Sequence, residues 1–129
     1  MVIKKYIKIG LIGCGYWAAN ILKSFEELGY KNIHVFDKDK NKSKIFKKKF
    51  KFIKIRNDLD QMINDQEIDC FFLATPASTH FSIGRKVLEK KKNLFIEKPA
   101  TTNTKHLKEL DKIAKKKKIN FYDRICLCF

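Results

Sequence analysis

Residues 6–28 read YIKIGLIGCGYWAANILKSFEEL, and they contain the most informative pattern in this 129-residue chain. Apolar side chains alternate up to Ile12, as in a strand, and then recur with helical spacing from Trp17 to Leu28. The turn between these two segments is Gly13-Cys14-Gly15-Tyr16-Trp17-Ala18. Two glycines at this spacing, between a strand and a helix, are typical of a turn that offers main-chain N–H groups to a pyrophosphate.

An acidic residue at a suitable distance supports this interpretation. Asp37 lies 22 residues after Gly15, at the end of a second predicted strand at 33–36. In dinucleotide-binding domains an acid about 20 residues beyond the glycine turn accepts hydrogen bonds from the ribose hydroxyls. A carboxylate repels a 2′-phosphate, so we predict NAD rather than NADP, although Lys38 weakens that preference. The alternative role for Asp37 is to cap the next helix, which Asp39 could also do.

Strands and helices alternate along the chain. Further strands are predicted at 52–55, 68–74, 94–96 and from 119 onward, and further helices at 41–50, 59–64, 78–91 and 103–117. We expect Ser78 or Thr79 to cap the helix at 78–91. The alternation predicts one α/β domain with a doubly wound, mostly parallel sheet of strand order 3-2-1-4-5-6, the Rossmann fold. This order places Lys54 on an edge strand and the apolar segment 68–74 inside the sheet.

The charge is strongly positive, with 29 Lys and Arg against 14 Asp and Glu. The lysine runs 47–49, 90–92 and 115–118 close predicted helices, where cations stabilise the helix dipole. They are therefore predicted to lie on the rim away from the ligand-binding end of the strands. We expect no nucleic-acid partner, and a basic nucleic-acid binder is the last of the alternatives.

Neither a membrane segment nor a metal site is predicted. No apolar run approaches the ~18 residues that a span needs, and the start lacks the features of a signal peptide. The four cysteines are Cys14, Cys70, Cys126 and Cys128, and their spacing gives no metal-binding motif. They are expected to be free thiols in the cytoplasm.

Two more motifs follow predicted strands of the inner sheet. Residues 74–80 read Ala-Thr-Pro-Ala-Ser-Thr-His, and residues 97–99 read Glu-Lys-Pro. Ligands bind beyond the carboxyl ends of the strands in open α/β sheets. A lysine there can transfer a proton or stabilise a hydroxyl that is losing one, which makes Lys98 a candidate catalytic residue.

In this order the three motifs resemble the Gfo/Idh/MocA family (glucose–fructose oxidoreductase, inositol dehydrogenase and relatives) over residues 5–120. The Gly-Cys-Gly-Tyr-Trp form is most similar to the nucleotide-sugar branch. The resemblance implies a pyrophosphate site at Gly13, Gly15, Tyr16 and Trp17, an adenosine-ribose contact at Asp37, a nicotinamide side at Thr75 and Pro76 with His80 nearby, a nicotinamide-ribose contact at Glu97, and a catalytic Lys98. For His80, a structural hydrogen-bonding role is the alternative.

The family also implies an activity, namely NAD(P)-dependent oxidation of a secondary hydroxyl in a sugar, cyclitol or nucleotide sugar. Three departures qualify this expectation: Ala18 replaces the usual third glycine, residues 121–129 match loosely, and the family's substrate domain is absent from these 129 residues. Substrate contacts, and a homo-oligomer, are therefore expected only in a full-length form. The alternatives are a stand-alone dinucleotide-binding module and a truncated, inactive fragment.

Overall fold

The computed structural model describes residues 7–122 of the chain. Within this range the strands are β1 (Lys8–Ile12), β2 (Ile33–Phe36), β3 (Lys54–Ile55), β4 (Ile68–Leu73), β5 (Asn93–Ile96) and β6 (Phe121–Tyr122). The helices are α1 (Tyr16–Glu27), α2 (Lys40–Lys49), α3 (Leu59–Asn64), α4 (Ala77–Glu89) and α5 (Thr104–Lys117). The predicted alternation is confirmed. The predictions for residues 123–129, including Cys126 and Cys128, lie outside the described residues.

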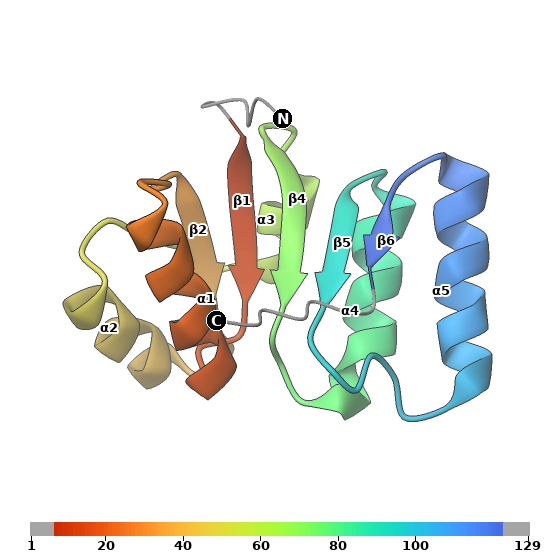
Figure 1. The fold of residues 1–129 in the computed structure, drawn as a ribbon, viewed down its shortest axis with the longest axis horizontal. Helices are drawn as coiled ribbons and strands as arrows, with labels where there is room; N and C mark the ends of the chain where they lie inside the picture. The colour runs from red at the N-terminus through yellow and green to blue at the C-terminus, as the bar shows by residue number, and fades with distance from the viewer. Residues whose placement is uncertain (1–6, 123–129) are drawn as a thin grey trace.

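All six strands form one parallel sheet in the order β3-β2-β1-β4-β5-β6 (Figure 1). The predicted Rossmann fold and strand order are therefore confirmed. Lys54 pairs with His34 on the edge strand β3 and is exposed, as the sequence indicated. The apolar strand β4 lies in the middle, paired with β1 on one side and β5 on the other.

The helices cover the two faces of the sheet in two groups. Buried side chains of α3, α4 and α5 form one core with inward residues of β4 and β5, and those of α1 and α2 form a second core with β1 and β2. Figure 1 shows α1 and α2 in front of the sheet and α4 behind it. This arrangement leaves the carboxyl ends of β1, β2 and β4 at one rim, where the predicted motifs begin.

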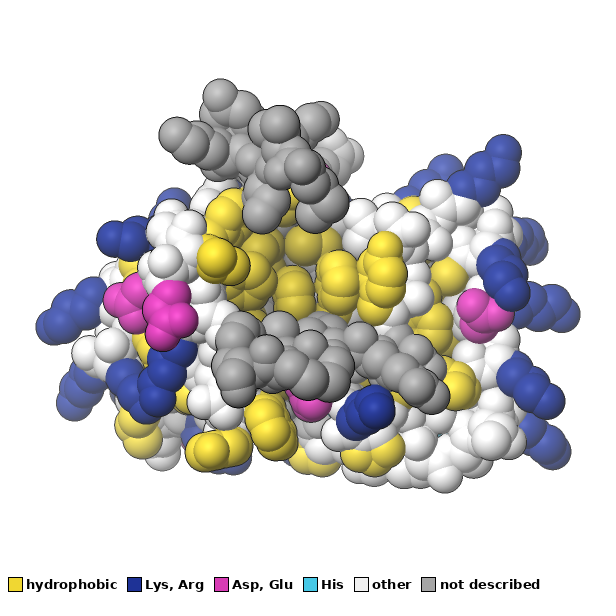
Figure 2. All heavy atoms as spheres, viewed as in Figure 1, with side chains coloured by type: hydrophobic (Ala, Val, Ile, Leu, Met, Phe, Trp, Pro, Cys, Tyr) yellow, Lys and Arg dark blue, Asp and Glu magenta, His cyan; other side chains and the backbone are white. Residues whose placement is uncertain are grey.

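Aromatic rings stack across β4, β5 and β6. Phe72 and Phe95 are register partners whose ring centroids lie 4.6 Å apart, and Phe95 stacks on Tyr122 at 4.7 Å. Tyr122 is 46% exposed. Figure 2 shows hydrophobic side chains gathered over the middle strands and lysine and arginine side chains toward the two ends of the molecule. The stacked rings contribute to strand pairing as cross-strand pairs.

Each helix end lies within two residues of its predicted position. Asp39 caps α2 and Asn103 caps α5 through their side-chain oxygens, and Gly29 follows α1 at φ +73°. The expected cap of α4 by Ser78 or Thr79 is wrong. The helix already begins at Ala77, after Pro76, and no side chain caps the main-chain N–H groups of its first turn. Within residues 7–122 no helix combines the length and the apolar character that crossing a membrane requires.

His34, in strand β2, has a buried polar side chain. It is 7% exposed, and its Nδ1 lies 3.3 Å from a guanidinium nitrogen of Arg56, which pairs with Asp65 at 2.9 Å. Its Nε2 is buried without a hydrogen-bond partner among the described residues. Burial, with the positive charges of Lys8 and Arg56, lowers the pKa of His34 below its ordinary 6.5.

This histidine makes stability depend on pH. The unfolded chain takes up the proton at a higher pH than the folded chain, so the neutral imidazole contributes fully above about pH 6.5 and its contribution is lost as the pH falls below that value. Between about pH 7 and about pH 5, the free energy of unfolding in urea should fall further in wild type than in His34→Asn. Parallel pH profiles for the two proteins would contradict this assignment.

Candidate functional site

The glycine turn leaves the carboxyl end of β1 in a conformation that only glycine adopts easily. Gly13 has φ +106°, and a Cβ there would lie 2.6 Å from the Ala74 carbonyl oxygen at the end of β4. Its N–H donates to the Phe36 carbonyl at 2.8 Å, at the end of β2. The turn is therefore held between the two strands that flank β1.

Gly15 has a different function in the turn. It is the N-cap residue of α1 at φ −97°, it is exposed, and no side chain accepts a hydrogen bond from the first turn of the helix. A Cβ at Gly15 would meet nothing within 4 Å. The N-terminal N–H groups of α1 thus face open space, together with the partial positive charge of the helix dipole.

Asp37 brings a carboxylate to this turn from the end of β2. Its Oδ2 accepts a hydrogen bond from the Cys14 N–H at 2.8 Å, and its Oδ1 accepts one from the Asp39 N–H at 2.7 Å. Asp39 caps α2, so the alternative in which Asp37 is the cap is wrong. Burial and the charge of Asp37 raise the pKa of the Cys14 thiol to about 12, which keeps it a neutral packing group.

These residues line one cleft of about 510 Å³ at the carboxyl ends of β1, β2 and β4. Among the predicted site residues, Gly13, Gly15, Asp37, Thr75 and Pro76 line it. The sequence reasoning missed other lining side chains, namely Lys42, Leu59, Thr79 and Ile83. They lie in the first turns of α2 and α3 and in α4. The only sequence signal for them was that the ligand was expected at the carboxyl ends of the strands.

The remaining predicted residues lie beside the cleft. Tyr16 and Trp17 begin α1 and are 77% and 54% exposed. Their side chains do not line the cleft, so only their main-chain N–H groups in the first helical turn are available to the site. Glu97 and Lys98 follow β5, where the Glu97 N–H donates to the Leu73 carbonyl at 3.0 Å. Lys98 is exposed and lines another hollow, of about 340 Å³, at the N-terminal end of α5.

His80 lies in the first turn of α4 and is 1% exposed. Its Nε2 lies 2.6 Å from the Thr75 carbonyl oxygen, and its Nδ1 lies 2.9 Å from that of Pro99 and 3.1 Å from that of Ala100. The ring therefore connects the loop after β4 with the loop after β5.

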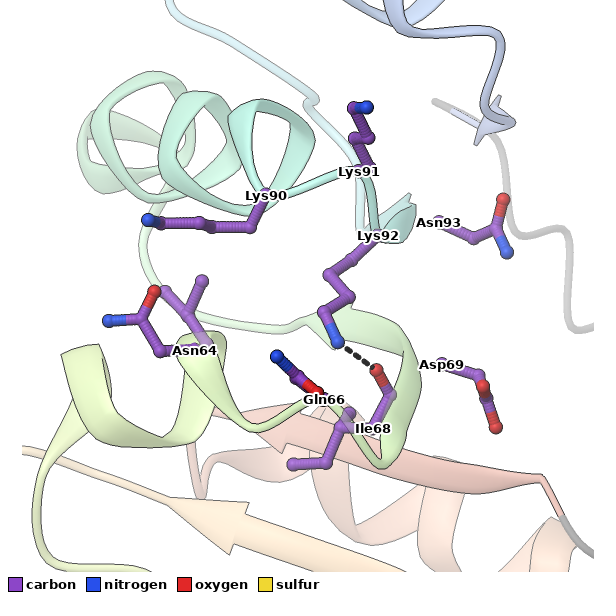
Figure 3. Close-up of a pocket in the computed structure, with 9 residues that line it drawn as sticks. Asn64, Gln66, Ile68, Asp69, Lys90, Lys91, Lys92 and Asn93 are labelled. Atoms are coloured by element: carbon purple, nitrogen blue, oxygen red, sulfur yellow. Dashed lines mark hydrogen bonds between the residues drawn. The ribbon is translucent and has the colours of Figure 1, made fainter.

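Two of the lysine runs border hollows on the surface. Lys90, Lys91 and Lys92 border a hollow of about 600 Å³ near the amino ends of β4 and β5, on the rim opposite the cleft, as predicted (Figure 3). There the Lys92 ammonium donates to the Ile68 carbonyl at 2.7 Å and the Asp65 carbonyl at 2.8 Å, so it serves as a structural tie.

The run at 47–49 closes α2, and the Lys47 ammonium donates to the Lys51 and Ile53 carbonyl oxygens just before β3. Lys47 and Lys48 line a hollow between α2 and β3 that also includes Asp37 and Lys38, at the border of the cleft.

The cleft fits a dinucleotide on three counts. It offers the open N–H groups at Gly15 and the start of α1 for a diphosphate, the carboxylate of Asp37 for a ribose, and apolar side chains at Leu59 and Ile83 for a base. Its volume lies within the range of cofactor sites.

Comparison with known proteins agrees with this geometry. Residues 7–122 match the model of the GFO_IDH_MocA family, an oxidoreductase family with an NAD-binding Rossmann fold. The chain therefore belongs to the Gfo/Idh/MocA family and contains its NAD-binding domain.

The relatives differ in what they bind. Inositol 2-dehydrogenase of Acidothermus cellulolyticus is 26% identical over 104 residues, which are 79% of this chain and 30% of the relative. The WlbA dehydrogenase of Chromobacterium violaceum, solved with NADH and UDP-GlcNAcA, has TM-score 0.82 at 24% identity over 93% of this chain and 35% of that one. Biliverdin reductase of Synechocystis sp. PCC 6803, solved with biliverdin and NADP+, has TM-score 0.80 at 23% identity over 90% and 37%. The chain spans between 20% and 32% of the length of its curated relatives.

The two glycines of the turn should respond differently to alanine. Gly13→Ala places a Cβ against the Ala74 carbonyl at φ +106°, so we expect a loss of roughly 1–3 kcal/mol of unfolding free energy as well as weaker NADH binding. Gly15→Ala should change that free energy by less than about 1 kcal/mol, because its Cβ meets nothing in the protein.

In the Gly15→Ala protein the added methyl group would occupy the space proposed for the diphosphate. Calorimetric titration with NADH should therefore show affinity at least about tenfold below wild type in a protein of near-normal stability. Undiminished NADH binding by Gly15→Ala would place the diphosphate elsewhere.

Proposed function

We propose that this chain binds NAD as the cofactor domain of a dehydrogenase that oxidises a secondary hydroxyl of a sugar, cyclitol or nucleotide sugar, or catalyses the reverse reduction. The observation that carries the proposal is the meeting of the glycine turn, the open N-terminus of α1 and Asp37 in one cleft. Inositol 2-dehydrogenase and the WlbA dehydrogenase with its UDP-sugar support the substrate class.

Each part of the cleft has a task in this proposal. Gly13 shapes the turn, the N–H groups at Gly15, Tyr16 and Trp17 bind the diphosphate, and Asp37 accepts hydrogen bonds from the adenosine ribose. Thr75 and Pro76 form the wall on the nicotinamide side, and Glu97 contacts the nicotinamide ribose. The bound dinucleotide supplies a nicotinamide ring that accepts or gives up a hydride.

Lys98 is the proposed catalytic residue. It follows β5 on the rim that holds the cleft, it is exposed, and its ammonium can stabilise a substrate hydroxyl that loses its proton. Substrate contacts are proposed to come from a second domain, because the match covers only 20% to 32% of the length of these relatives. Residues 1–129 by themselves should bind cofactor and turn over little substrate, because the groups that position the substrate are proposed to belong to that second domain.

Calorimetry tests cofactor binding directly. A folded sample titrated with NAD+ and NADH should show one site with a dissociation constant below about 1 mM, the range of weak but specific binding. A folded sample that binds neither dinucleotide would show that the proposed function is wrong.

NAD should bind more tightly than NADP, since the Asp37 carboxylate repels a 2′-phosphate. In Asp37→Asn that charge is absent while Lys38 and Lys42 remain at the cleft, so the ratio of NADP to NAD affinity should rise by about tenfold. Asp39→Asn is the matched control. It removes the same charge two residues further on and keeps a good helix cap, so its ratio should stay at the wild-type value. An equal rise in both variants would assign the effect to net charge alone.

The role of Lys98 is tested in a form that carries a substrate-binding domain. Lys98→Ala should lower kcat by roughly a hundredfold or more and leave the dissociation constant for NADH nearly unchanged, because the ammonium acts on the substrate hydroxyl. Lys105→Ala, at another exposed lysine in the first turn of α5, is the control and should keep full turnover. If Lys98→Ala lost NADH affinity and turnover equally, Lys98 would be a binding residue only.

A further inference from the structure

His80 links two loops that are separated in sequence and adjacent in space. Its Nε2 meets the Thr75 carbonyl oxygen at 2.6 Å, where β4 ends, and its Nδ1 meets the carbonyl oxygens of Pro99 and Ala100 at 2.9 and 3.1 Å, beyond β5. Carbonyl oxygens only accept hydrogen bonds, so a ring N–H is the donor in each hydrogen bond that His80 makes to a loop. The ring thus lies in contact with both loops.

The two loops lie on either side of the proposed reaction centre. Thr75 and Pro76 line the cleft, and Pro99 directly follows Lys98. The loop after β4 has a further hydrogen-bonding contact with α4. The Thr79 hydroxyl lies 2.7 Å from both the Pro76 carbonyl oxygen and the Thr75 hydroxyl. The His80 side chain therefore lies between the Lys98 loop and this wall and contacts both.

His80 itself is too deeply buried to touch a ligand. Only 1% of its surface is exposed, and it is absent from the residues that line the cleft. Both of its nitrogens are occupied by main-chain oxygens. Any influence of His80 on the cofactor therefore passes through Thr75, Pro99 and Ala100.

We propose that His80 is a positioning residue that fixes the loop carrying Lys98 against the Thr75–Pro76 wall and thereby sets the geometry of the nicotinamide half of the site. This inference rests on the proposed function. It assigns His80 no contact with the cofactor and no part in binding the adenosine half, which the glycine turn and Asp37 hold at the ends of β1 and β2.

The experiment compares two ligands that share the adenosine, diphosphate and ribose groups and differ in the nicotinamide. NADH and ADP-ribose are titrated into wild type, His80→Asn and His80→Gln, and the emission intensity and lifetime of bound NADH are recorded. Asn places an amide near the Nδ1 position, toward Pro99, and Gln places one near the Nε2 position, toward Thr75, so each variant retains one of the two links. Both are better tolerated in a buried polar position than alanine, which would leave the carbonyl oxygens without donors.

We expect each variant to bind ADP-ribose within about twofold of wild type, while its NADH affinity falls by about tenfold and the emission of bound NADH moves toward that of free NADH. His106→Asn is the matched control. His106 lies on α5, stacks on Phe81 of α4 at 4.0 Å and has its Nδ1 3.3 Å from the Asn103 amide, whereas the bonds to Thr75, Pro99 and Ala100 belong to His80, so this variant should match wild type in every measurement.

Other outcomes decide against the inference in recognisable ways. Parallel loss of NADH and ADP-ribose binding would mean that His80 only supports the fold, and unchanged NADH emission would mean that it does not position the loops. The same selective loss in His106→Asn would overturn the assignment to His80. If wild type bound neither ligand, the proposed function would be wrong, and that result is distinct from a failure of the His80 variants alone.

Discussion

The hydrogen bond from the Cys14 N–H to the Asp37 carboxylate, 2.8 Å long, joins the turn after β1 to the end of β2. Gly13 fits under the Ala74 carbonyl at the end of β4, so the turn is fixed from the other side as well. Three neighbouring strands thus hold one short segment, and α1, which follows this segment at the cleft, begins without a side-chain cap on its N–H groups. Such a preformed set of donors loses little conformational freedom when it binds an anion. The rest of the site is arranged around this turn.

Much of the fold could be predicted because strand and helix periodicities differ and crossovers are right-handed. The edge position of β3 followed from Lys54, and the central position of β4 followed from its apolar run. The start of α4 could not be predicted as well. Ser78 and Thr79 are good caps by residue type, but Pro76 fits the N-cap backbone and the helix begins one residue before Ser78.

The site was predictable where it depends on sequence spacing and was missed where it depends on contacts between distant segments. Gly13, Gly15 and Asp37 have characteristic residue types at characteristic offsets, and they meet in the cleft. The links from His80 to Pro99 and Ala100 cross 19 and 20 residues of sequence, and no local pattern reveals them. His34 did leave a trace, since a histidine between Ile33 and Val35 is a polar residue within a buried strand.

Amide NMR on the 15N-labelled chain during titration with NADH offers the most direct test of where the cofactor lies. If the diphosphate rests on the glycine turn, the largest shift changes fall on the N–H groups of Gly13, Cys14, Gly15 and Tyr16, with further changes at Asp37 and Lys38. The hollow at the opposite rim, at Asn64, Lys91 and Asn93, should then stay at its unbound shifts. Changes concentrated in that hollow, with the turn after β1 unaffected, would contradict the assignment of this cleft as the dinucleotide site.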